Sequence, residues 1–137
     1  MARAPCSGDR SSGATSRSLD HLHLRGDSDS QAPGAVAVDA SGNVVLTGTF
    51  YGTVDFGGGA LTSAGSGDIF VAKFGSGGAH LWSKRFGDGD YQYGIAVAVD
   101  ASENAIVTGY FFGTVDFGGG AFTSAGSQDI FVVKFKS

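Results

Sequence analysis

The sequence is poor in cysteine and proline, and it lacks any long apolar run. Its single cysteine, Cys6, provides neither a disulfide framework nor the spacing of a zinc site. Nowhere do 18 apolar residues follow one another, and no apolar stretch typical of a secretory signal is visible, so neither a membrane span nor export is supported. Two prolines among 24 glycines, without a Gly-X-Y period, exclude collagen and favour many tight turns.

Positive charge is scarce outside the N-terminal region. Four arginines lie in residues 1–25, which leaves five basic and eleven acidic side chains in the remainder. A phosphate backbone is a poor partner for such an acidic region, so no nucleic-acid binding is expected. Residues 1–18 are rich in Arg, Ser, Gly and Ala, and we predict a disordered tail there, with a transit peptide as the alternative.

What the sequence does contain is a repeat. Residues 35–74 recur as residues 96–135, and 31 of the 40 aligned pairs are identical. Near-identical copies at a fixed spacing indicate a chain built from one supersecondary unit. Residues 19–137 are therefore predicted to form one region, with units over residues 35–95 and 96–137 and with residues 19–34 as the degenerate end of a preceding repeat.

Within one repeat the pattern predicts four antiparallel strands. Ala35–Val38 is apolar at every position, as in a strand that is buried on both faces, and a turn follows it. The other strands are predicted over residues 43–51, 68–74 and 80–86, with a short hairpin inside residues 52–67. The last strand is the most polar, which fits an edge position. No glycine-free segment keeps the helical period over ten positions, so a helical fold is excluded.

Four strands that grade from apolar to charged describe a blade of a β-propeller, so the predicted fold is all-β with about two four-stranded blades. The strands DIFVAKF and HLWSKRFG and the block GIAVAVDASENAIVTGYF resemble the SBBP-type repeats of seven-bladed β-propellers. Such repeats are abundant in large secreted or surface proteins of myxobacteria and their relatives. The resemblance covers about residues 26–137. It implies a propeller of many blades without a general catalytic role, outside the cell or at its surface.

Two blades cannot close a ring, since propellers have about four to eight of them. Apolar blade faces left in water are prone to association. The expected partners are further copies of this chain, or further blades of a longer protein of which this chain is a fragment, and both alternatives stay open. Residues 19–25 hold the position of a fourth strand and are predicted to close another blade.

An acidic loop provides the main candidate for a cofactor site. Asp88, Asp90 and Gln92 place oxygen atoms at alternating positions, as calcium loops do, and Asp27, Asp29 and Gln31 repeat the pattern. The third carboxylate and the downstream glutamate of such loops are lacking, so an exposed turn is the simpler interpretation. For a transition metal, His21, His23 and His80 form an incomplete ligand set.

Aromatic residues near this loop provide a candidate ligand site. Trp82, Tyr91 and Tyr93, together with Arg85, are predicted to stack on a sugar ring and bond to it between blades. The alternative is that these aromatic side chains pack against a neighbouring blade.

Catalytic motifs are not apparent. The sequence has no Gly-x-Ser-x-Gly elbow, and its Val-Asp-Phe-Gly segments lack the other parts of a kinase. Pairs of carboxylates such as Asp39 and Asp100, or Asp68 and Asp129, are interpreted as turn-forming residues. We therefore expect a non-enzymatic structural or interaction module with protein partners, and a carbohydrate-binding module formed by associated blades as the alternative.

Overall fold

The chain forms strands, turns and loops throughout residues 25–26 and 29–136, which are the residues that the computed structural model describes. The predicted all-β fold class is confirmed, and the sheets are antiparallel and open. The strands of these residues are β1 (Arg25–Gly26), β2 (Gln31–Val38), β3 (Val44–Phe50), β4 (Thr53–Asp55), β5 (Ala60–Thr62), β6 (Asp68–Phe74), β7 (His80–Phe86), β8 (Gln92–Val99), β9 (Ala105–Phe111), β10 (Thr114–Asp116), β11 (Ala121–Thr123) and β12 (Asp129–Phe135).

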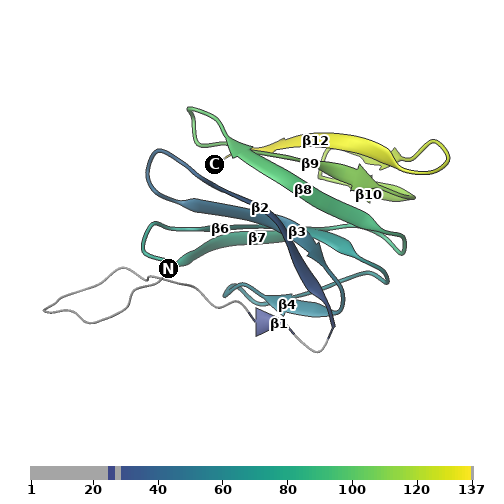
Figure 1. The fold of residues 1–137 in the computed structure, drawn as a ribbon, viewed down its shortest axis with the longest axis horizontal. Helices are drawn as coiled ribbons and strands as arrows, with labels where there is room; N and C mark the ends of the chain where they lie inside the picture. The colour runs from purple at the N-terminus through teal and green to yellow at the C-terminus, as the bar shows by residue number, and fades with distance from the viewer. Residues whose placement is uncertain (1–24, 27–28, 137) are drawn as a thin grey trace, which may run out of the picture.

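Two sheets and two hairpins make up the fold (Figure 1). The first sheet has the strand order β2-β3-β6-β7, and the second has the order β12-β9-β8. The hairpin β4–β5, with β1 beside β4, lies on the side of the first sheet that faces away from the second sheet (Figure 1). The hairpin β10–β11 is its counterpart. We call β2 to β7 the first unit and β8 to β12 the second unit.

The predicted strands over residues 43–51, 68–74 and 80–86 are confirmed as β3, β6 and β7, and the predicted hairpin is confirmed as β4–β5. The polar strand β7 lies at the edge of its sheet, as expected. The predicted boundary between residues 95 and 96 falls inside β8, so the units of the structure begin slightly earlier than those of the repeat.

The prediction for Ala35–Val38 is wrong in its extent and in its burial. Strand β2 already begins at Gln31, and a bulge between Pro33 and Ala35 shifts its register. Val36 and Val38 are 60% and 63% exposed, because no described strand covers their side of β2. Apolar residues can be buried but need not be, and in the first unit the two valines of β2 remain exposed.

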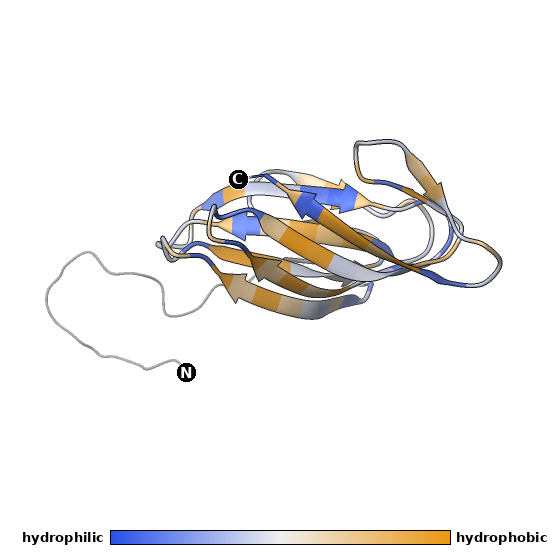
Figure 2. Cartoon of the chain, turned by 90° about the horizontal axis from the view of Figure 1, so that it is seen from above, coloured by the Kyte–Doolittle hydropathy of each residue, from blue (hydrophilic) through white to orange (hydrophobic). Residues whose placement is uncertain are grey.

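The core consists of two apolar clusters. One lies between the sheets and combines Val45, Ile69 and Val71 of the first unit with Ala105, Val107, Phe111, Val115 and Phe131 of the second. The other joins the first sheet to its own hairpin through Phe50, Val54, Phe56, Phe70, Ala72 and Phe74. In Figure 2 the hydrophobic segments run along the strands of both layers. Burial of these side chains is the main force that holds the two sheets together.

The predictions for the N-terminal region lie largely outside the described residues. These are the tail over residues 1–18 and most of the candidate strand over residues 19–25. Arg25 and Gly26, which are described, pair with β4 and so extend the hairpin of the first unit. Among the described residues no helix is long and apolar enough to cross a membrane.

Candidate functional site

Carboxylates after the first strand of each unit hold a turn. Asp39 Oδ1 accepts the backbone N–H groups of Ser41 and Asn43, both at 2.9 Å. Asp100 Oδ1 accepts the equivalent groups of Ser102 and Asn104 at the same distance. The predicted turn role of both aspartates is therefore confirmed.

A lysine of the same unit approaches each of these aspartates. Lys73 Nζ lies 3.5 Å from Asp39 Oδ2, and Lys134 Nζ lies 2.9 Å from Asp100 Oδ2. The contact with Lys134, followed by the backbone donor of Asn104, lowers the pKa of the Asp100 carboxyl. Both carboxylates are thus held as anions by turn and lysine contacts, which suits a structural role.

The acidic loop between the units is held by hydrogen bonds within the protein. Asp88 Oδ1 accepts the N–H of Asp90 at 2.8 Å and the side-chain amide of Gln92 at 2.6 Å. Its other oxygen accepts the N–H of Thr114 at 2.8 Å. Burial raises the pKa of the Asp88 carboxyl, but these donors outweigh it and lower the pKa below the ordinary value.

Gln92 completes this network from a position without solvent exposure. Its amide nitrogen also donates to the carbonyl of Phe112 at 2.9 Å, and its amide oxygen accepts the N–H of Asp88 at 3.2 Å. Two of the three predicted calcium ligands therefore have protein partners, and they fasten the loop to the second unit. Among the described residues no group of three or more His, Cys, Asp or Glu side chains is placed to hold a metal ion.

The predicted sugar residues occupy different places. Trp82 packs on Phe135 of the second unit, with 6.1 Å between ring centroids, and lies opposite Lys73 near one end of β6. Tyr91, in contrast, contacts Tyr51, which follows the opposite end of β3. Since strands extend about 3.3 Å per residue, Trp82 and the tyrosines do not share one pocket.

Arg85 pairs with a buried carboxylate, and its own side chain is 33% exposed. Its Nη1 donates to Asp68 Oδ2, and the Asp68 side chain has no solvent exposure. The N–H of Ala64 also donates to Asp68 Oδ2, at 2.9 Å. Burial raises the pKa of the Asp68 carboxyl despite these two donors. Asp68 Oδ1 has no hydrogen-bond partner. Removing Arg85 would leave the buried Asp68 carboxylate without its cation.

An aromatic row brings the two predicted tyrosines together with three side chains that the sequence did not single out. Tyr91 and Tyr93 are parallel, with 6.1 Å between ring centroids. Tyr51 flanks Tyr91 at 6.3 Å, and Tyr110 flanks Tyr93 at 4.8 Å, with Phe112 beyond it. Burial, followed by the hydrogen bond with Tyr51, raises the pKa of Tyr93 to about 12. The available signal was the aromatic residue that both repeats carry at positions 51 and 112.

Equivalent faces of the two sheets differ in how far they are buried. We call A face the side of the first sheet that bears Val45, Ile69 and Val71, and the side of the second sheet that bears Ile106, Ile130 and Val132. The opposite sides are the B faces. The A face of the first unit packs on the B face of the second, and Val45, Ile69 and Val71 have no exposure there. On the free A face of the second unit, Ile130 and Val132 are 81% and 69% exposed.

The B faces show the converse difference. Val97 and Val99 of the second unit are partly buried against the first, whereas their counterparts Val36 and Val38 are exposed. Beside them, the B face of the first unit has a groove of about 150 Å³ that is lined by Gln31, Ala32, Pro33, Leu46, Val54, Phe56 and Phe70. One A face and one B face are therefore joined within the chain. The A face of the second unit is free, and the B face of the first unit is free along β2, beyond the part that the hairpin β4–β5 covers.

These free faces and the aromatic row are the surfaces that the geometry offers for function. The sequence matches no protein-family model and no curated protein. The architecture is an all-β fold of two packed repeat units.

Proposed function

We propose that this chain is a non-enzymatic interaction module whose units stack like the blades of a β-propeller and bind further units of the same kind. One observation carries the proposal. Ile69 and Val71 have no exposure, while their counterparts Ile130 and Val132 are largely exposed. The same surface is thus an interface in one unit and free in the other.

The internal interface supports a specific geometry for this binding. It joins an A face to a B face, so the contact is heterologous and can be repeated. Val97 and Val99, which are partly buried on the used B face, recur as the exposed Val36 and Val38 on the B face of the first unit. The free A face carries Ile130 and Val132 where the used one carries Ile69 and Val71. A second copy of the chain therefore presents a surface that matches the one already bound.

The carboxylates support a role without catalysis. Asp39, Asp88 and Asp100 accept backbone N–H groups in turns, and Asp68 is closed off from solvent by burial. A general acid or base needs a carboxyl that reaches a substrate. The side chains that combine exposure with a shared surface are instead apolar, which suits association.

Sedimentation velocity over a range of protein concentrations tests the proposal. We expect the wild-type chain to form species larger than a monomer as concentration rises. A double substitution, Ile130→Asp with Val132→Asp, places charge on the free A face and should return the chain to a monomer. The control Ala101→Asp adds charge at an exposed turn and should assemble like the wild type. A wild-type chain that stays monomeric at the highest concentration contradicts the proposal.

A second candidate function is carbohydrate binding, and the aromatic row favours it. Tyr91 is 45% exposed and lies parallel to Tyr93, so the row presents a ring face together with phenolic hydroxyls at the junction of the two units. Flat apolar faces flanked by hydroxyl groups are suited to stacking on sugar rings and bonding to them.

Glycan-array binding tests this second candidate. We expect Tyr91→Ala to abolish any glycan signal, because it removes the exposed ring, while leaving the melting temperature nearly unchanged. Trp82→Ala is the matched control, since Trp82 contacts Phe135 away from the row. A signal that persists in the Tyr91 variant, or is lost only in the Trp82 variant, would place the sugar elsewhere.

A further inference from the structure

Strand β7 fills a groove in the first unit. It pairs with β6 from Ile69 opposite Phe86 to Lys73 opposite Trp82. The ring of His80 packs beside the hairpin turn, where a Cβ added to Gly58 would lie 2.2 Å from His80 Cε1. The Arg85 side chain pairs with the buried Asp68 carboxylate. Strand β7 thus pairs with the edge of β6, packs beside the hairpin β4–β5 and supplies the cation for Asp68.

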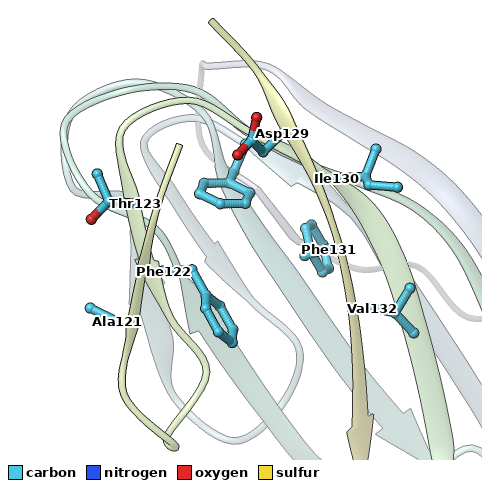
Figure 3. A pocket seen from close by; sticks show the side chains of 8 residues that line it. Ala121, Phe122, Thr123, Asp129, Ile130, Phe131 and Val132 are labelled. Carbon is cyan, nitrogen blue, oxygen red and sulfur yellow. The ribbon is translucent and has the colours of Figure 1, made fainter. Parts of the chain in front are cut away.

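The second unit has the same groove without such a strand. β12 pairs with β9 along one edge, and its other edge pairs with no strand that the structure describes. A Cβ added to Gly118 or Gly119, the counterparts of Gly57 and Gly58, would meet no atom within 4 Å. The result is a cavity of about 450 Å³ that is lined by Phe111, Ala121, Phe122, Thr123, Asp129, Ile130, Phe131 and Val132 (Figure 3).

Asp129 gives this groove a charge that the first unit neutralises. Its Oδ2 accepts the N–H of Ala125 at 3.1 Å, as Asp68 Oδ2 accepts that of Ala64. Within residues 25–26 and 29–136, however, no arginine or lysine lies at ion-pair distance from Asp129. Asp129 therefore occupies the position of Asp68, which pairs with Arg85 in the first unit.

We propose that the free edge of β12 binds an extended protein segment with the sequence pattern of His80–Phe86, whose arginine pairs with Asp129. The segment runs antiparallel to β12, as β7 does to β6. Its arginine lies opposite Phe131 and its tryptophan lies opposite Lys134, by equivalence with Phe70 and Lys73.

Two kinds of contact recognise this segment. Backbone hydrogen bonds to the strand edge supply affinity with little dependence on sequence, as in other cases of strand addition. The arginine supplies selectivity, because a guanidinium bonded to a carboxylate is stronger than a neutral pair and is directional. Phe122, which is exposed on the hairpin, provides the apolar wall of the groove.

This binding uses the edge of β12 and Asp129, whereas the proposed stacking of units uses sheet faces, and Ile130 and Val132 border both surfaces. The dependence on arginine separates the two inferences by experiment. The occupant of the edge is recognised by its arginine and its extended backbone, and the occupant of the A face is recognised by apolar area.

Fluorescence anisotropy with the whole chain and a labelled peptide tests the inference. The peptide AHLWSKRFG has the sequence of residues 79–87. We expect it to bind, and we expect the same peptide with Arg85→Ala to bind about tenfold more weakly, since it loses a charge-assisted bond. Equal binding of the two peptides, or binding of neither, overturns the inference. Because both peptides meet the same wild-type chain, misfolding of a variant cannot cause the difference.

Two further measurements locate the site. Asp129→Asn should weaken binding of the arginine peptide by a similar factor, whereas Asp90→Asn, the same change in the exposed loop between the units, should not. Hydrogen exchange with the peptide bound should protect amides of β12. Protection confined to another edge strand, such as β2 or β8, overturns the assignment.

Discussion

Gly94 shows at the scale of one residue how the two units meet. A Cβ at this position would lie 2.5 Å from Thr47 Oγ1 and 3.0 Å from the carbonyl oxygen of Gly48, both in the first unit. A Cβ on Gly34 would in turn lie 2.2 Å from the carbonyl oxygen of Gly94. The strands β2 and β8 therefore approach each other through backbone, which glycine alone permits at this distance.

The substitution Gly94→Ala should accordingly separate the sheets locally. We expect it to lower the free energy of unfolding by about 1–3 kcal/mol, the usual effect of forcing an extra carbon into a packed site. Gly77→Ala is the matched control, because a Cβ there meets no atom within 4 Å. Urea titration of the two variants measures the difference. Equal free energies of unfolding for the two variants would contradict a close backbone contact between the units at Gly94.

At the scale of elements, the hairpins decide how each B face is covered. The Phe56 ring packs on Phe70 with 4.8 Å between centroids, and Phe117 packs on Phe131 at the same distance. The Phe117 ring also contacts Phe86 of the first unit at 5.0 Å. The hairpin β10–β11 therefore belongs both to its own sheet and to the junction between the units, whereas β4–β5 serves its own sheet.

The repeat provides an internal control for how much the contact between the units contributes to the free energy of unfolding. Val71 and Val132 are the same residue at equivalent positions of β6 and β12, one without exposure and the other 69% exposed. We expect Val71→Ala to cost about 2 kcal/mol of unfolding free energy, through lost burial and the cavity left behind. Val132→Ala should change it by less than about 0.5 kcal/mol. Similar losses for both, measured in urea on dilute protein, would contradict the assignment of faces.

Across the whole molecule, one A face and one B face are joined, while the A face of the second unit and the β2 side of the first unit's B face are exposed. Because the pair is heterologous, its repetition leads to a ring if the rotation between units closes and to an open filament if it does not. The particle mass from sedimentation distinguishes these outcomes, since a ring has one defined mass and a filament grows with concentration. The proposed binding of an extended segment at the free edge of β12 is a second mode of association, which differs from the stacking of faces.

Much of the fold followed from local patterns. The strands β3, β6 and β7 and the hairpin β4–β5 were predicted from β-branched and aromatic runs between glycines, because turn chemistry and strand period act over a few residues. The turn roles of Asp39 and Asp100 were predicted for the same reason. The start of β2 was not predicted. Residues 31–33 pair with β3 across a bulge between Pro33 and Ala35, and no local sequence pattern indicates this bulge.

The candidate sites were harder to predict. Trp82, Arg85 and Tyr91 are near one another along the chain, yet the register of β6 and β7 separates Trp82 from the tyrosines, and Arg85 turns to Asp68. The aromatic row instead draws Tyr51 and Tyr110 from other strands. Distance in sequence does not report such neighbours, because strand pairing brings together residues that are dozens of positions apart.

Sequence patterns alone predicted the all-β fold class, the repeated unit and the positions of most strands and turns. Those properties depend on short-range periodicity and on near-identity of the two copies. The unequal roles of equivalent residues become visible in three dimensions, where Val71 is buried and Val132 is exposed, and where Asp68 pairs with an arginine that Asp129 lacks. The physical reason is that identical sequences have identical propensities, whereas burial and ion pairing depend on what lies across the interface.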